Sequence, residues 1–174
     1  TCALPIWRHH LPETRGAGVA WLDYDQDGRA DLYMVQSGPL PDGSTPADAD
    51  AGTGANQLLR QRPDGTFQTV PGVAADSGYG KGVSVADYDN DGYPDIFVGN
   101  WGADALYRNN GDGTFSNVSS AAGVDDGRLT SSSGWADFDG DGWLDLFVVS
   151  YVHYEIATAV RCGDLIRQII DYCH

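Results

Sequence analysis

The stretch Asp23-Tyr-Asp25-Gln-Asp27-Gly28-Arg-Ala-Asp31 has two close copies further along the chain. They are Asp87-Tyr-Asp89-Asn-Asp91-Gly92-Tyr-Pro-Asp95 and Asp137-Phe-Asp139-Gly-Asp141-Gly142-Trp-Leu-Asp145. Each copy has aspartate at positions 1, 3, 5 and 9 and glycine at position 6. Alternate residues of a tight loop can turn inward, and Ca²⁺ takes six to eight oxygen ligands at roughly 2.3–2.6 Å. The pattern therefore predicts three calcium-binding loops.

Glycine at position 6 permits the sharp bend that returns position 9 to the ion, and the carbonyl at position 7 completes the ligand shell. Mg²⁺ keeps its waters and rarely fills an all-protein cage, so Ca²⁺ is the favoured ion. Solvated acidic turns are the alternative, and they explain one Asp-Gly turn better than three aligned sets of carboxylates. The predicted ligands are Asp23, Asp25, Asp27, Arg29 and Asp31; Asp87, Asp89, Asp91, Tyr93 and Asp95; and Asp137, Asp139, Asp141, Trp143 and Asp145.

The segments on either side of each loop predict strands. An EF-hand would need a glutamate at position 12 and flanking helices. Here the flanks, such as Gly18–Leu22 and Leu32–Val35, are short, β-branched or aromatic, and lack a helical period. Each loop is therefore expected to join two strands of a β-hairpin.

Outer hairpins extend the pattern into a repeat. Gln57–Arg60 and Thr66–Val70 flank Asp64-Gly65, and Ala105–Arg108 and Thr114–Val118 flank Asp112-Gly113, both hairpin-turn signals. Four strands in a repeat of about fifty residues are typical of a β-propeller blade. The predicted fold is all-β, with about two and a half four-stranded units at 18–70, 82–118 and, in part, 133–150. Gly78–Gly82 lacks Walker spacing and is interpreted as a flexible loop between blades.

The amino-acid composition limits the kinds of binding partner that the chain is expected to have. The formal charge of −15 comes almost entirely from aspartate, because Glu13 and Glu155 are the only glutamates. This acidity is explained by the loops and argues against nucleic acid or an anionic membrane as partner. No run of about eighteen apolar residues is present, so membrane insertion is not expected.

The string Leu106-Tyr-Arg-Asn-Asn-Gly-Asp-Gly-Thr-Phe115, with Ala122-Gly-Val124 and Trp135–Phe147, resembles the FG-GAP/VCBS repeats of the cartilage acidic protein and ASPIC/UnbV group. The resemblance covers about residues 16–152. It implies a calcium-loaded, integrin-α-like propeller, usually of seven blades, on a secreted or surface protein. With its few blades and without an ASPIC domain, the chain is interpreted as a fragment of such a protein.

The two ends are set apart from the repeats. Residues 1–17 are a lead-in, and residues 1–6 match the translation of a sequencing adapter. Residues 151–174 are expected to contain a short helix, because Leu165, Ile166, Ile169 and Ile170 have helical spacing. If Cys2 is not native, Cys162 and Cys173 remain as a pair that is expected to form a disulfide, with two unrelated thiols as the alternative.

Three functions remain open. The first is a non-catalytic extracellular module for recognition or adhesion, with structural calcium and an unknown protein or glycan ligand. The second is a subunit that self-associates through exposed blade edges into rings, tubules or fibres. The third is a carbohydrate-binding or hydrolytic domain whose site lies on the loops opposite the calcium side, with the long loop Ser37–Ala55 as its main expected contributor. Trp21, Trp135 and Trp143 are interpreted as packing residues, and a sugar platform is their alternative role. Asp76, outside every loop, is expected to be solvated.

Overall fold

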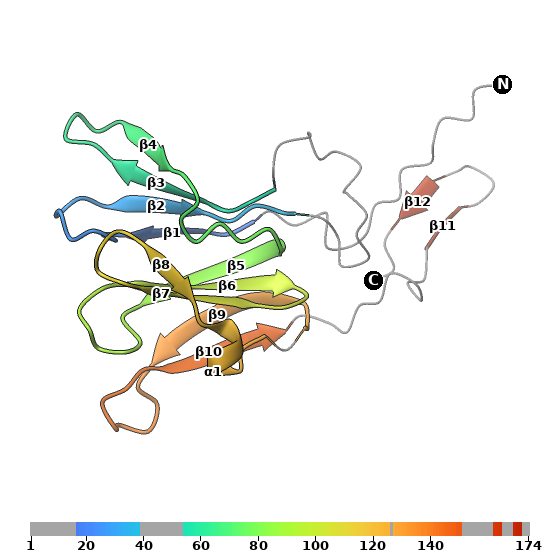
Figure 1. The fold of residues 1–174 in the computed structure, drawn as a ribbon. Helices are drawn as coiled ribbons and strands as arrows, with labels where there is room; N and C mark the ends of the chain where they lie inside the picture. Colours follow the sequence, from blue (N-terminus) through green and yellow to red (C-terminus); the bar gives the residue numbers. More distant parts are fainter. Residues whose placement is uncertain (1–16, 39–53, 126, 151–161, 165–168, 172–174) are drawn as a thin grey trace.

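The computed structural model describes residues 17–38, 54–125, 127–150, 162–164 and 169–171. These residues form an all-β fold of two four-stranded antiparallel sheets, a two-stranded sheet and a short hairpin. Figure 1 shows the first three sheets stacked face to face, with the aspartate loops projecting from the same side of the stack. The predicted fold class is confirmed, and the sheets are three successive blades, the third with two strands.

The first blade contains β1 (Val19–Leu22), β2 (Asp31–Met34), β3 (Gln57–Gln61) and β4 (Phe67–Val70), paired in chain order. Leu22 pairs with Asp31, so the first aspartate loop closes the β1–β2 hairpin. At the β3–β4 turn the Asp64 carboxylate accepts hydrogen bonds from the backbone N–H and hydroxyl of Thr66. The hairpins predicted from the Asp-Gly signals are therefore present.

The second blade repeats this order with β5 (Tyr79–Ala86), β6 (Asp95–Trp101), β7 (Ala105–Asn109) and β8 (Phe115–Asn117). Ala86 pairs with Asp95 around the second loop. The third blade contributes β9 (Thr130–Ala136) and β10 (Asp145–Ser150), with Ala136 opposite Asp145 around the third loop. The position of each aspartate loop relative to its hairpin is thus the same in all three blades.

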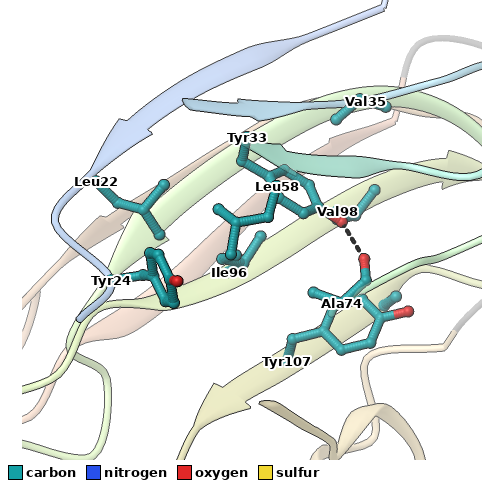
Figure 2. Close-up of a cluster of buried hydrophobic side chains, with 10 residues drawn as sticks. Leu22, Tyr24, Tyr33, Val35, Leu58, Ala74, Ile96, Val98 and Tyr107 are labelled. Carbon is teal, nitrogen blue, oxygen red and sulfur yellow. Dashed lines mark hydrogen bonds between the residues drawn. The ribbon is translucent and has the colours of Figure 1, made fainter. Parts of the chain in front are cut away.

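The main core lies between the first and second blades (Figure 2). Tyr33 and Leu58 of the first blade face Ile96 and Val98 of the second, and all four side chains are fully buried. The Tyr33 hydroxyl donates a hydrogen bond to the Ala74 carbonyl at 2.6 Å, which satisfies its polar atom inside this apolar layer.

Burial along the strands follows their place in the stack. Every residue of β6 is buried, because β6 lies between the first and third blades. In β2 buried residues alternate with half-buried ones, and in β10 half-buried residues alternate with exposed ones. Leu32–Val35 and Leu146–Val149 are apolar on both faces, a pattern that predicts enclosure between two neighbouring blades. For the described residues this prediction is wrong, because only alternate residues of β2 are buried and no residue of β10 is. The enclosed strand is β6 of the middle blade.

Gly78–Gly82 is not a flexible loop, since β5 begins at Tyr79 and its first four residues are buried. A Cβ on Gly80 would collide with the Val35 side chain, so this glycine permits the close approach of two blades rather than mobility. The sequence signal of a glycine-rich loop was misinterpreted for that reason.

The expected C-terminal helix is also wrong within the described residues. Cys162–Asp164 (β11) pairs antiparallel with Ile169–Asp171 (β12). Adjacent β-branched isoleucines favour a strand, and four apolar residues are too few to decide between the helical and extended periods. A helix that was not predicted, α1 (Ser119–Ala122), follows β8 and ends at Gly123, whose φ is 67°.

Candidate metal centres

Each aspartate loop is folded around the carboxylate at its first position. This carboxylate accepts hydrogen bonds from the backbone N–H groups at positions 5 and 6. In the first loop, Asp27 and Gly28 donate to Asp23 at 3.0 and 2.9 Å. Asp87 and Asp137 accept the same pair of bonds in the other loops, at 2.9–3.1 Å. The loop conformation is therefore encoded locally and repeated three times.

The carboxylate at position 9 ties the end of each loop to its start. Asp95 accepts from the Tyr88 N–H at 3.0 Å and from the Asn109 N–H of β7 at 2.8 Å. Asp31 makes the equivalent bonds with Tyr24 and Gln61. Asp31 and Asp95 are fully buried, and each uses both carboxylate oxygens to accept hydrogen bonds from backbone N–H groups. They therefore stabilise the hairpin itself.

Three groups of carboxylates converge closely enough to hold a metal ion. Within each group, one oxygen per residue lies within 4.8 Å of the others. The groups are Asp23, Asp25 and Asp27; Asp87, Asp89 and Asp95; and Asp137, Asp139 and Asp145. The remaining predicted carboxylates, Asp31, Asp91 and Asp141, lie in the same loops but outside these groups.

Two carboxylate oxygens show that the loops fit a cation. Asp25 Oδ1 and Asp89 Oδ1 are buried and have no hydrogen-bond partner. Both belong to the third position of a loop. A buried unpaired carboxylate oxygen is costly, and an all-oxygen cluster of negative charge is the donor set that a hard divalent cation prefers. The first two loops therefore fit such an ion on their own geometry.

The third loop has the same backbone but a different environment. Asp137, Asp139 and Asp145 are exposed, whereas their counterparts are half-buried or buried. Asp145 accepts from the Phe138 N–H at 3.0 Å. In the other loops the second bond to position 9 comes from the third strand of the blade, and no such strand pairs with β10 in the described part of the chain.

Two arginine side chains form ion pairs with carboxylates of the first loop, and these pairs were not predicted from the sequence. The Arg60 Nη2 lies 2.7 Å from Asp25 Oδ2 and 2.9 Å from Asp27 Oδ2. Arg29 also pairs with Asp27 through its side chain. The alignment of Arg60 with Arg108 was visible in the sequence, but the register that brings β3 alongside the loop was not. Two guanidinium groups thus offset part of the charge of the first loop.

Electrostatic crowding is visible in the second loop. Burial raises the pKa of Asp95 to about 6, and the nearby carboxylates of Asp89 and Asp91 add to the shift, while the backbone hydrogen bonds oppose it. Burial likewise raises the pKa of Asp31 in the first loop. A bound divalent cation would favour the ionised form of each group.

The tryptophans beside the loops have different roles. Trp135 stacks on Tyr88 of the neighbouring blade, with ring centroids 6.0 Å apart, so its interpretation as a packing residue is correct. Trp21 contacts Phe67 within the first blade at 6.1 Å and is 60% exposed. Trp143 is 55% exposed, so its interpretation as a packing residue is not supported in the described part of the chain.

Asp76 is only partly exposed and is hydrogen-bonded through both carboxylate oxygens, whereas a solvated side chain was expected. Its carboxylate accepts hydrogen bonds from the Gly78 N–H and from the Asn100 side chain, the latter at 2.7 Å. Asp76 therefore has a structural role between blades, and it is unsuitable as a neutral surface control.

Residues 47–98 and 87–148 each match the FG-GAP-like repeat family. Together these matches cover more than half of the chain. The chain belongs to the FG-GAP repeat family. The matches include the second and third aspartate loops, and the family resemblance inferred from the sequence is confirmed.

Relatives among characterised proteins agree with this assignment. The chain is 32% identical over 136 residues to cartilage acidic protein 1 of Homo sapiens, and 39% identical over 144 residues to that of Xenopus tropicalis. Each alignment covers 75% of this chain and 20% of the relative. The chain thus spans about a fifth of the length of these relatives.

Some site predictions stay predictions. The metal-ligand role of the position-7 carbonyls of Arg29, Tyr93 and Trp143 is untested. Cys173 lies outside the described residues, as does most of Ser37–Ala55, so the disulfide and the third functional hypothesis are not addressed. Among the described helices, none has the length and apolar character needed to span a bilayer.

Proposed function

We propose that each of the three loops binds one Ca²⁺ ion whose role is structural. The observation that supports this most strongly is the pair of buried, unpartnered oxygens on Asp25 and Asp89. Every side-chain donor in the three groups is a carboxylate oxygen, which suits Ca²⁺ better than metals that prefer nitrogen or sulfur. The ion would neutralise carboxylates that otherwise repel one another at the turn of each hairpin.

We further propose that the domain is a non-catalytic extracellular module for recognition or adhesion. Weak calcium sites are useful where calcium is abundant, and extracellular modules commonly have Kd values of about 10⁻⁴–10⁻³ M. FG-GAP membership and the similarity to cartilage acidic protein 1 support this proposal. Its ligand would be a protein or a glycan.

A second candidate is self-association, and the exposed face of the third blade favours it. Phe138, Trp143, Phe147 and Val149 are 91%, 55%, 74% and 42% exposed. Several exposed large apolar side chains on one blade are more than the scattered single ones that a surface usually carries, and they favour an interaction surface. In this second candidate the face packs against another copy of the chain.

The test of the recognition module is calcium-dependent binding. The full chain is immobilised and exposed to arrays of glycans and extracellular-matrix proteins, with about 2 mM Ca²⁺ or with chelator. Selective binding that chelator abolishes is expected. If the folded, calcium-loaded chain binds no glycan or protein of the arrays, the recognition role is contradicted. Turnover of a substrate in a parallel hydrolase screen would favour an enzyme. Light scattering on the same chain free in solution reports self-association.

A further inference from the structure

The side chain at the fourth position of a loop reaches the next loop. Gln26 Nε2 donates a hydrogen bond to the Gly92 carbonyl at 2.5 Å. Asn90 Nδ2 donates to the Gly142 carbonyl at 3.1 Å. Both donors are fourth in their own loop, and both acceptors are sixth in the loop of the following blade. The same cross-blade contact therefore occurs twice.

The two amide side chains belong to residues whose backbone has a positive φ. Gln26 and Asn90 have φ of 57° and 56°, in the left-handed region where a side chain is unfavourable. The third loop has Gly140 at this position, with φ of 77° and no side chain to donate. Glycine would relieve this strain in the first two loops as it does in the third, so Gln26 and Asn90 carry a conformational cost, which points to a role.

The hydrogen bond acts on a peptide group that already contacts a carboxylate of the next loop. The peptide that joins Gly92 to Tyr93 accepts from Gln26 through its carbonyl and donates through its N–H to Asp91 Oδ1 at 2.9 Å. The peptide that joins Gly142 to Trp143 lies in the same way between Asn90 and Asp141, with the second bond 2.8 Å long. Hydrogen bonds in series polarise one another.

We propose that Gln26 and Asn90 are positioning residues that couple metal binding in each loop to metal binding in the loop of the next blade. This inference rests on the proposed binding of Ca²⁺. An ion in one loop fixes the fourth residue, whose amide then holds the sixth-position peptide and fifth-position carboxylate of the neighbour. The coupling is reciprocal, because a binding free energy shared by two sites changes both affinities by the same factor.

The test uses Ca²⁺ titrations of the full chain followed by the amide NMR signals of Gly92 and Gly142, which report the second and third loops separately. The main variant is Asn90→Gly, which the backbone tolerates because Gly140 occupies the same position in the third loop. Gln26→Gly is the matched control, since it breaks the first link and leaves the bond to Gly142 intact. Asn90→Gln keeps an amide donor.

Asn90→Gly is expected to weaken Ca²⁺ binding in the third loop about threefold, the effect of one net hydrogen bond. Gln26→Gly should weaken the second loop by a similar factor and leave the third within twofold, and Asn90→Gln should restore most of the loss. Unchanged third-loop affinity in Asn90→Gly, with all three loops of the wild type binding Ca²⁺, would overturn the coupling alone. A wild-type chain that binds no Ca²⁺ would overturn both the coupling and the proposed function.

Discussion

Phe97 and Phe147 occupy the same position in successive blades, two residues after the last aspartate of the loop, yet Phe97 is fully buried and Phe147 is 74% exposed. Phe97 lies on β6, against which β9 of the third blade packs. In the described part of the chain no further sheet lies against Phe147. The contrast shows that stacking of blades, rather than any single sheet, buries this position.

Phe97→Ala and Phe147→Ala should therefore differ sharply in stability. Truncation of a fully buried Phe typically costs about 3–5 kcal/mol, whereas exposed substitutions usually stay within about 0.5 kcal/mol. Urea unfolding of the two variants measures the difference. Equal losses at low protein concentration would mean that Phe147 is covered in solution, and a loss that grows with concentration would favour self-association.

Asp89→Ala should reduce the stabilisation by calcium. At about 2 mM Ca²⁺ and a Kd of about 10⁻⁴ M, each site contributes about 1.8 kcal/mol, most of which the variant should lose. Without calcium its melting temperature should be unchanged or higher, because one carboxylate of a crowded group is gone. Asp125→Ala, at an exposed residue outside the loops, is the matched control. If both variants respond to calcium as the wild type does, the loops are only acidic turns.

Arg60→Gln should raise the calcium affinity of the first loop. Arg60 pairs with Asp25 and Asp27, so its removal leaves the loop more negative. A unit charge at about 4 Å is worth about 1 kcal/mol even in water, which corresponds to about a fivefold change in Kd. Arg108→Gln, at the equivalent position of the second blade, should change affinity less. A weaker first loop in Arg60→Gln would show that Arg60 organises the carboxylates instead of competing for them.

Alkaline pH should destabilise the core between the first two blades. Burial raises the pKa of Tyr107 to about 12 and raises that of Tyr33 in the same core. The folded state therefore binds the phenolic proton more tightly than the unfolded state, so stability is present below about pH 10 and is lost as pH rises from about 10 to 12. Tyr107→Phe should flatten this loss in stability curves measured between pH 9 and 12. An identical pH profile in the variant would contradict the assignment.

The parts of the fold that depend on local residues were predictable. Asp87, for example, accepts hydrogen bonds from residues four and five positions later, so spacing alone encodes the loop. The strand bounds agree with the structure to within a few residues. The blade architecture also followed, because repetition of a four-stranded unit has few structural solutions.

Contacts between distant segments could not be predicted. The pairing of Arg60 with the first loop and the bonds of Gln26 and Asn90 to the next blade depend on how sheets stack. The interpretation of Gly80 was wrong for the same reason. In the sequence its glycine-rich surroundings indicate a flexible turn, but in the structure the absence of a Cβ leaves room for the side chain of Val35 from the neighbouring blade. The two strands around residues 162–171 failed because a short apolar segment is compatible with both periods.

The stoichiometry of calcium binding tests the central claim most directly. Isothermal titration calorimetry of the chelator-treated, dialysed chain with Ca²⁺ should give three ions per chain, one for each aspartate group. Asp89→Asn should reduce this number to two, while Asp125→Asn leaves it at three. Absence of saturable binding up to about 10 mM Ca²⁺, well above the Kd range of extracellular sites, would contradict the account.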